Sequence, residues 1–170
     1  MDGRPEGHRL FNFTISEYRL EQHPLVKEAD IIHLHWVSGG FLDFSRFFSK
    51  VSKQVVWTLH DMNPFTGGCH YANECVGYLT DCQACPQLEG TADRSIAKKM
   101  LAQKIEALSR FKGQLSVLTP SHWLKNCSMQ SALFKKYDHR HIYYIVEGQH
   151  YYLQDKESCR ENLSIPQDKT

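Results

Sequence analysis

Short apolar runs alternate with helical segments along this chain, and this alternation restricts the possible folds more than any other feature of the sequence. Four runs have the length and the β-branched or aromatic content of buried strands, at residues 30–36 (DIIHLHW), 54–60 (QVVWTLH), 115–120 (LSVLTP) and 141–146 (HIYYIV). Strands that alternate with helices predict right-handed crossovers and a parallel sheet. We therefore expect an α/β fold in which helices cover both faces of one parallel sheet.

Each gap between two predicted strands contains a predicted helix. The first helix begins at Phe41, where apolar residues start to recur at helical spacing. The third is capped by Ser121 and runs to about Phe134. A short fourth helix is expected at residues 156–163, in a tail that turns polar.

The second helix has the clearest pattern. Thr91 or Asp93 can serve as its N-cap, and it is expected to end at about Lys112 and Gly113. Its apolar face is predicted to consist of Ala97, Leu101, Ile105, Leu108 and Phe111.

Composition and charge favour a globular domain over a nucleic-acid-binding or membrane-spanning protein. The chain of 170 residues is 41% hydrophobic and 12% aromatic, which is typical of a soluble globular domain. Its formal net charge of +1 argues against nucleic acid as a partner, because such partners are bound through an excess of basic residues. No apolar run approaches the roughly 20 residues that cross a bilayer. We expect a single domain that lies in the cytoplasm.

The second predicted strand ends in a histidine and an aspartate that open a long loop, HDMNPFTGGCHYANECVGYLTDCQACP. Ligands of parallel sheets bind beyond the carboxyl ends of the strands, so His60 and Asp61 are the first candidates for a site. An imidazole with its ordinary pKa of about 6.5 can act as a general base or hydrogen-bond a hydroxyl near neutral pH. A histidine that caps the strand and satisfies backbone groups is the alternative, and the residues alone leave both open.

Four cysteines occupy this loop, at Cys69, Cys75, Cys82 and Cys85. In a reducing compartment, clustered cysteines are more often thiols or metal ligands than disulfides. The closing C-x-x-C pair suits a tetrahedral metal, and two further thiolates complete a four-cysteine structural zinc site, which is simpler than a set that includes His70. Structural zinc is the first hypothesis for the loop, and reduced thiols or paired disulfides are the alternatives. A catalytic zinc is not expected, because it needs an open coordination position.

A longer stretch resembles a known family. The run VVWTLHDMNPFTGGCHY, preceded by ADIIHLHWVSGGF and followed by CPQLEG and TPSHWL, is similar to the amino-terminal domain of family 4 glycosyltransferases, in particular those that build colanic-acid-like and capsular surface polysaccharides. The resemblance implies one Rossmann-like half of a GT-B fold, in which the amino-terminal domain binds a saccharide or lipid-linked acceptor. A nucleotide sugar, bound by a carboxy-terminal domain, would be the donor substrate.

The resemblance also implies roles for individual residues. His60 matches the family's cleft histidine beside the transferred sugar, and Asp61 would support it. Gly67 and Gly68 would let the backbone approach the donor sugar or its phosphates, although a tight turn explains a glycine pair equally well. His35 matches a family position and would border the cleft, whereas His33, on the same face of its strand, is expected to be packed and hydrogen-bonded.

The chain departs from the family's pattern in ways that bear on activity. It begins downstream of the family's first strand and glycine-rich turn, and it lacks the nucleotide-sugar domain. Asn63 stands where many relatives have tryptophan, and residues 146–150 replace a proline, asparagine, glycine run. We expect a truncated acceptor domain at residues 1–150, with a cysteine-rich loop at 61–90 and a linker at 151–170. Sugar transfer would then need a separate donor-binding domain or chain.

A second class of function remains open, namely a non-catalytic, zinc-stabilised module that binds a glycan or a membrane. The second predicted helix carries basic residues that can rest on anionic lipid at the inner face of the membrane. A solvated helix face is the alternative for the same charges. These residues are Lys98, Lys99, Lys104, Arg110 and Lys112.

Overall fold

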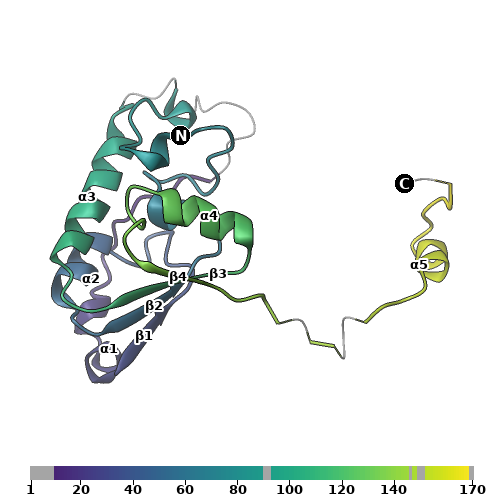
Figure 1. Cartoon of the computed structure of the whole chain (residues 1–170), viewed down its shortest axis with the longest axis horizontal. Coiled ribbons are helices and arrows are strands. Elements are labelled where there is room, and N and C mark those ends of the chain that lie inside the picture. The colour runs from purple at the N-terminus through teal and green to yellow at the C-terminus, as the bar shows by residue number, and fades with distance from the viewer. Residues whose placement is uncertain (1–9, 90–92, 146, 149–151, 169–170) are drawn as a thin grey trace.

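A four-stranded parallel sheet, with the strands in the order β1-β2-β3-β4, forms the centre of the protein (Figure 1). The computed structural model describes residues 10–89, 93–145, 147–148 and 152–168. The α/β, Rossmann-like fold expected from the sequence is confirmed. The strands are β1 (Ile31–Leu34), β2 (Gln54–Thr58), β3 (Leu115–Thr119) and β4 (Asp138–His141), and the helices that connect them are α2 (Phe44–Lys50), α3 (Ile96–Arg110) and α4 (His122–Gln130).

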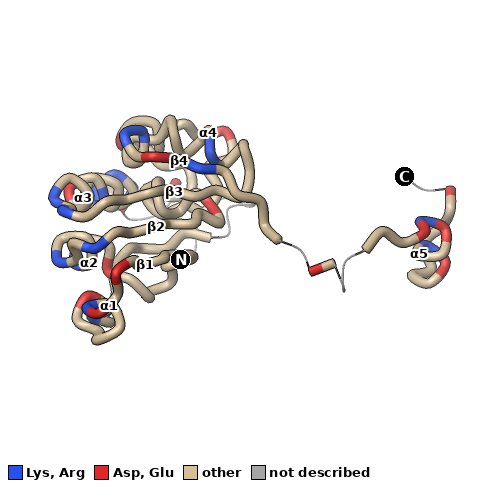
Figure 2. Tube along the Cα trace, turned by 60° about the horizontal axis from the view of Figure 1, so that its bottom comes forward, with Lys and Arg blue, Asp and Glu red and all other residues tan. Residues whose placement is uncertain are grey.

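The two faces of the sheet differ in how far they are buried. Val55 and Trp57 of β2 and Val117 of β3 are 0% exposed beneath α2, α3 and α4 (Figure 1). On the opposite face, Ile31 is 55% exposed and Val56 is only partly buried. We expected helices on both faces, but in the described residues these three helices cover one face. Right-handed crossovers that always step to the next strand in the same direction place every helix on the same side. Figure 2 shows the strands side by side in this order.

Aromatic side chains fill the space between the sheet and the helices. The Trp57 ring lies 5.6 Å from the ring of Phe44, and 5.8 Å from the rings of both Phe48 and Phe134. Burial of one such side chain stabilises the fold by about 2–3 kcal/mol. Trp57 Nε1 also donates a hydrogen bond to the carbonyl oxygen of His35, over 3.0 Å. The core is thereby attached to the end of β1.

The predicted bounds of the first helix and of the fourth strand are wrong. The first helix starts at Phe44 rather than Phe41, because the Asp43 side chain accepts a hydrogen bond from the backbone N–H of Arg46 and caps it there. The fourth strand covers residues 138–141 rather than 141–146. Strand β3 ends before Pro120, which has no N–H with which to continue the ladder. Residue 146 lies outside the described residues.

Helix α3 is present where predicted, but it begins and ends inside the predicted bounds. Ser95 occupies the N-cap position, and Asp93 lies before it and accepts a hydrogen bond from the Ser95 N–H. The alternative cap, Thr91, lies outside the described residues. Ala97, Leu101 and Leu108 are buried as predicted, but Ile105 is 38% exposed. The buried position beside it belongs to Lys104, which is 0% exposed.

The cap predicted for α4 is confirmed, since the Ser121 hydroxyl accepts a hydrogen bond from the Leu124 N–H. The helix ends at Gln130 instead of Phe134. After it, the Ser131 hydroxyl accepts a hydrogen bond from the Phe134 N–H and forms a separate turn.

The predicted tail helix is present, and it lies away from the sheet in Figure 1. The remaining elements are η1 (Leu20–Gln22), α1 (Pro24–Glu28), η2 (Asn63–Phe65), η3 (Gly77–Leu79), η4 (Pro86–Leu88) and α5 (Lys156–Asn162).

Among the described residues, no helix combines the length and the apolar character that are needed to cross a bilayer.

Candidate functional site

The ends of β1 and β2 bring two predicted site residues together. His35 follows β1 and His60 follows β2, and His35 Nδ1 lies 3.0 Å from His60 Nε2. The Tyr144 ring stacks on the His60 ring at 5.6 Å with an interplanar angle of 13°, and its hydroxyl contacts His60 Nδ1. Both ring nitrogens of His60 therefore have partners. We call His33, His35, His60 and Tyr144 the histidine site.

His33 extends this site along the open face of the sheet. As predicted, it lies on the same side as His35, and their ring centroids are 4.2 Å apart. Its Nε2 is 2.8 Å from the hydroxyl of Thr58, so the expected hydrogen bond is present. The expected packing is wrong, because His33 is exposed. The reason is that the described helices leave this face of the sheet accessible.

The environment of the histidine site favours neutral imidazoles. Burial lowers the pKa of His60, and the neighbouring His35 lowers it further, whereas Asp61 acts in the opposite direction. Burial also lowers the pKa of His33, and both His35 and His60 add to that effect. An imidazole that is neutral at pH 7 can accept a proton from a hydroxyl, which is the requirement for a general base.

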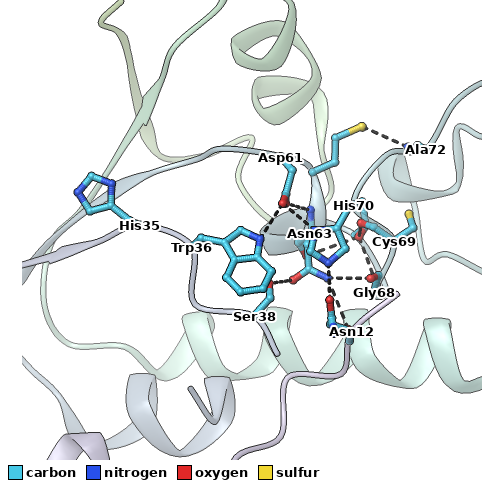
Figure 3. A network of polar contacts seen from close by, with 12 residues as sticks. Asn12, His35, Trp36, Ser38, Asp61, Asn63, Gly68, Cys69, His70 and Ala72 are labelled. Carbon is cyan, nitrogen blue, oxygen red and sulfur yellow. Dashed lines mark hydrogen bonds and ion pairs between the residues drawn. The ribbon is translucent and has the colours of Figure 1, made fainter. Parts of the chain in front are cut away.

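The Asp61 carboxylate is bonded to the loop. It is 7% exposed, and it accepts hydrogen bonds from Trp36 Nε1 at 3.0 Å and from the Asn63 N–H at 2.8 Å. It also lies 2.7 Å from His70 Nδ1. Figure 3 shows the indole, the imidazole and the carboxylate turned toward one another. These contacts give Asp61 a clear structural role, and its catalytic role remains a prediction.

His70 and Asn63 complete this network. His70 is 1% exposed, and its Nε2 lies 2.6 Å from Asn12 Oδ1, so both of its ring nitrogens are occupied. Asn63 donates from Nδ2 to the carbonyl oxygen of Gly68 at 2.7 Å and accepts the Ser38 hydroxyl at 2.7 Å (Figure 3). Asn63 therefore joins the segment at Ser38 to the segment at Gly68.

Sequence reasoning missed two members of this network, Asn12 and Trp36. Trp36 stands just after the first strand, at the sheet edge where Asp61 also lies, and that position could have indicated the contact. Asn12 belongs to a segment with no helical or strand periodicity, and it reaches His70 only because Phe11 pairs with Cys69 in an isolated antiparallel bridge. No sequence signal marks that pairing.

Gly67 and Gly68, predicted to let a ligand approach the backbone, pack against the protein itself. A Cβ on Gly67 would lie 2.3 Å from the carbonyl oxygen of Ala97, and one on Gly68 would lie 2.4 Å from the Phe11 ring. Gly68 also has a φ of +144°, which residues with side chains rarely adopt. Internal packing accounts for both glycines, and a role in substrate binding stays a prediction.

The four cysteines of the loop are reduced. All six cysteines of the described chain are free thiols, so the disulfide alternative does not describe this structure. Burial raises the pKa of Cys69 to about 11 and that of Cys82 to about 12, and it also raises the pKa of Cys85. Within the described residues, no group of three or more His, Cys, Asp or Glu side chains could hold a metal ion as it stands. Zinc remains a prediction on this evidence.

Lys104 was expected on a solvated or membrane-facing side of its helix, and that expectation is wrong. Its ammonium is buried beneath the loop, where Nζ donates to the carbonyl oxygens of Asn63 at 2.7 Å and Thr66 at 2.9 Å. Burial lowers the pKa of Lys104 to about 8, and nearby acidic groups act in the opposite direction. The periodicity of a helix cannot show that a loop will cover one of its charged residues.

Comparisons with known proteins give one partial match. No family model and no solved structure matches the chain. The chain is 36% identical over 70 residues to the putative colanic acid biosynthesis glycosyl transferase WcaC of Escherichia coli (strain K12). The match covers 38% of the chain and 17% of that relative, so the chain spans only about a sixth of its length. The likeness supports a relationship between this chain and a glycosyltransferase.

Proposed function

We propose that the chain is the acceptor-binding part of a family 4 glycosyltransferase of the GT-B type. The reaction would transfer a sugar from a nucleotide-sugar donor to a saccharide or lipid-linked acceptor in surface polysaccharide synthesis. The observation that carries the proposal is the pairing of His60 with His35 where β1 and β2 end, 3.0 Å apart. Parallel sheets bind ligands at that edge. The partial likeness to a glycosyltransferase supports sugar transfer as the reaction.

In this proposal His60 works as a neutral imidazole. Its lowered pKa keeps the ring neutral, and Nδ1 would accept a hydrogen bond from an acceptor hydroxyl or a hydroxyl of the transferred sugar once the Tyr144 hydroxyl moves away. His35 would fix the orientation of the His60 ring through the hydrogen bond between them. Tyr144 covers the other side of the ring, so a saccharide would approach beside Tyr144 or replace it.

The proposal also assigns the parts of the chain. Residues 1–150 would form the acceptor domain, residues 61–90 its cysteine-rich loop, and residues 151–170 a linker toward the donor-binding domain. That second domain would come from a further segment or a separate chain. Asp61 would act by holding Trp36 and the loop beside the cleft.

The contacts of α3 favour the glycosyltransferase over a membrane-binding module. Three of its basic residues pair with acidic side chains: Lys98 with Asp81, Lys99 with Asp93 and Arg110 with Glu106, at 3.0, 3.1 and 2.6 Å. Figure 2 shows basic and acidic positions interspersed along this side of the protein. With Lys104 buried, the face offers little unpaired positive charge to anionic lipid.

Ligand titrations of the isolated chain, followed by NMR of the histidine rings, test the proposal. Surface-polysaccharide oligosaccharides should shift the His35 and His60 signals, whereas nucleotide sugars should not, because the proposal assigns donor binding to a separate domain. His60→Ala should weaken saccharide binding by about tenfold or more, which is about 1.4 kcal/mol. Combined with a donor-binding domain, the same variant should lower the transfer rate by about 10²–10⁴-fold.

His23→Asn is the matched control, because it removes an exposed imidazole and keeps a side chain that can cap α1. It should leave both binding and transfer unchanged. Saccharides that leave the His35 and His60 signals unmoved, or a His60→Ala variant with normal transfer, would overturn the proposal.

A further inference from the structure

The four cysteines of the loop, separated by up to 16 positions in sequence, converge on one small cavity. Cys69, Cys75, Cys82 and Cys85 all line it, and its volume is about 10 Å³. This is close to the space of one water-sized sphere, so it suits a single atom and no organic ligand. Each of the four lies close enough to the other three for their charges to interact. The side chains of all four cysteines therefore lie around one small cavity.

Backbone N–H groups of the loop are directed at these sulfur atoms. The Gly67 N–H donates to Cys82 Sγ over 3.3 Å, and the Gly77 N–H donates to Cys75 Sγ over 3.4 Å. Cys85 accepts from the N–H groups at the start of the following turn, at residues 87 and 88. A hydrogen bond from an N–H group stabilises an anionic sulfur more than a neutral thiol. The loop therefore provides hydrogen-bond donors that would stabilise the cysteines as thiolates.

The backbone between the last two cysteines has the unusual form that such a turn requires. Cys82 and Ala84 both have a φ of +56°, in the left-handed region that residues with side chains seldom occupy. Two such residues so close together cost roughly 1–2 kcal/mol each. This conformation returns Cys85 to the same cavity as Cys82.

A buried positive charge lies next to the cluster. The ammonium of Lys104 is 0% exposed, its two printed hydrogen bonds go to carbonyl oxygens, and its charge interacts with Cys69 and Cys82. A buried cation is costly unless an anion compensates it. Four thiolates around a divalent ion carry a net charge of −2, and Lys104 would offset half of it. With neutral thiols, the carboxylate of Asp61 would be the remaining anion that acts on this ammonium.

We propose that Cys69, Cys75, Cys82 and Cys85 bind one zinc ion in a closed, tetrahedral structural site. The side chains would turn inward from their present positions until each sulfur lies about 2.3 Å from the metal. Each thiol gives its proton to solvent as its sulfur–zinc bond forms, and no sulfur changes oxidation state. His70 is excluded as a ligand because Asp61 and Asn12 occupy its two ring nitrogens.

The site would support the candidate active site without touching substrate. Cys69 lies between Gly68, which accepts the Asn63 side chain, and His70, which binds Asp61. Zinc would attach this segment to the far end of the loop at Cys85. The inference is independent of the proposed function, because a metal-held loop can exist whether or not sugar is transferred.

Metal analysis of the 170-residue chain, purified under reducing conditions without a metal-affinity tag, tests the inference. Elemental mass spectrometry should find about one zinc per chain. Titration of zinc into metal-free chain at pH 7 should release about four protons per ion, because each thiol loses its proton when it binds the metal. Cobalt(II) in place of zinc should give the intense thiolate charge-transfer absorption of a tetrahedral site.

Cys85→Ser should lose at least about tenfold in metal affinity. Cys159→Ser is the matched control, because this partly buried cysteine of α5 does not line the cavity, and the variant should bind zinc like the parent chain. If Cys85→Ser fails to fold, the proton and cobalt titrations of the parent chain still decide the matter. A folded parent chain that binds no zinc and gives no cobalt–thiolate absorption would overturn the inference.

Discussion

The side chains of His60 and Asp61 are neighbours in sequence, yet the structure gives them different surroundings. The imidazole of His60 meets His35 and Tyr144 at the open edge of the sheet. The carboxylate of Asp61 is buried among Trp36, Asn63 and His70. The histidine is thus available to a ligand, while the aspartate holds the loop that frames it.

Replacing His35 should change the titration of His60. His35→Asn removes an imidazole whose charge disfavours protonation of His60, so the pKa of His60 should rise. It should remain below the ordinary value of about 6.5, because burial, the larger cause, is retained. NMR titration of the His60 ring measures this shift. A His23→Asn variant should leave the pKa of His60 unchanged, and an unchanged value in His35→Asn would show that the two rings do not interact.

At the scale of elements, the loop after β2 is attached to α3 along its length. Gly67 touches the backbone at Ala97, and the Lys104 ammonium bonds two carbonyl groups of the loop. An ion pair between Lys98 and Asp81 adds a contact near the end of the loop. Helix α3 therefore works as the support on which the loop is built, and its buried lysine is part of that support.

A side chain at Gly67 should separate the loop from α3. Gly67→Ala places a methyl group 2.3 Å from a backbone oxygen that cannot move without displacing the helix. We expect the free energy of unfolding to fall by about 1–3 kcal/mol, measured by urea denaturation. Gly148→Ala is the control, since nothing lies within 4 Å of a Cβ there. Equal stabilities of the two variants would mean that the loop does not pack on α3 in solution.

At the scale of the whole molecule, the sheet has one covered and one accessible face, and the histidine site lies at an edge of the accessible one. Three histidines that are harder to protonate in the folded chain than in the unfolded chain make the fold sensitive to acid. The pKa values of His33, His60 and His139 are all lowered, chiefly by burial. Each is neutral in the folded chain at a pH where the unfolded chain already binds a proton.

Stability should therefore fall as the pH decreases. Near and below pH 6.5 these histidines bind more protons in the unfolded state than in the folded state, so they make the free energy of unfolding decrease as the pH falls through this range. Urea denaturation between pH 8 and pH 5, with a chelator present throughout, measures the slope without any metal contribution. A variant that combines His33→Asn and His60→Asn should show a shallower slope, and an identical slope would exclude these two residues as its cause.

In helix α3, the sequence predicts the buried apolar residues but not the burial of a lysine. The buried apolar residues Ala97, Leu101 and Leu108 follow from helical spacing, as predicted. Lys104 was placed on the wrong side, because its burial depends on carbonyl groups of a loop about 40 positions earlier in the chain. Hydrogen bonds over such separations leave no periodic signal.

The sequence by itself determined the alternation of strands and helices, and with it the parallel sheet and the edge where His35 and His60 lie. These follow from local periodicity and from the fixed hand of the crossovers, which are properties of short segments. Only the tertiary structure decided that the described helices cover a single face, that Asp61 faces the loop, and that four cysteines meet in one cavity beside Lys104. Those arrangements depend on packing between distant segments, where one residue's neighbours are set by the fold as a whole.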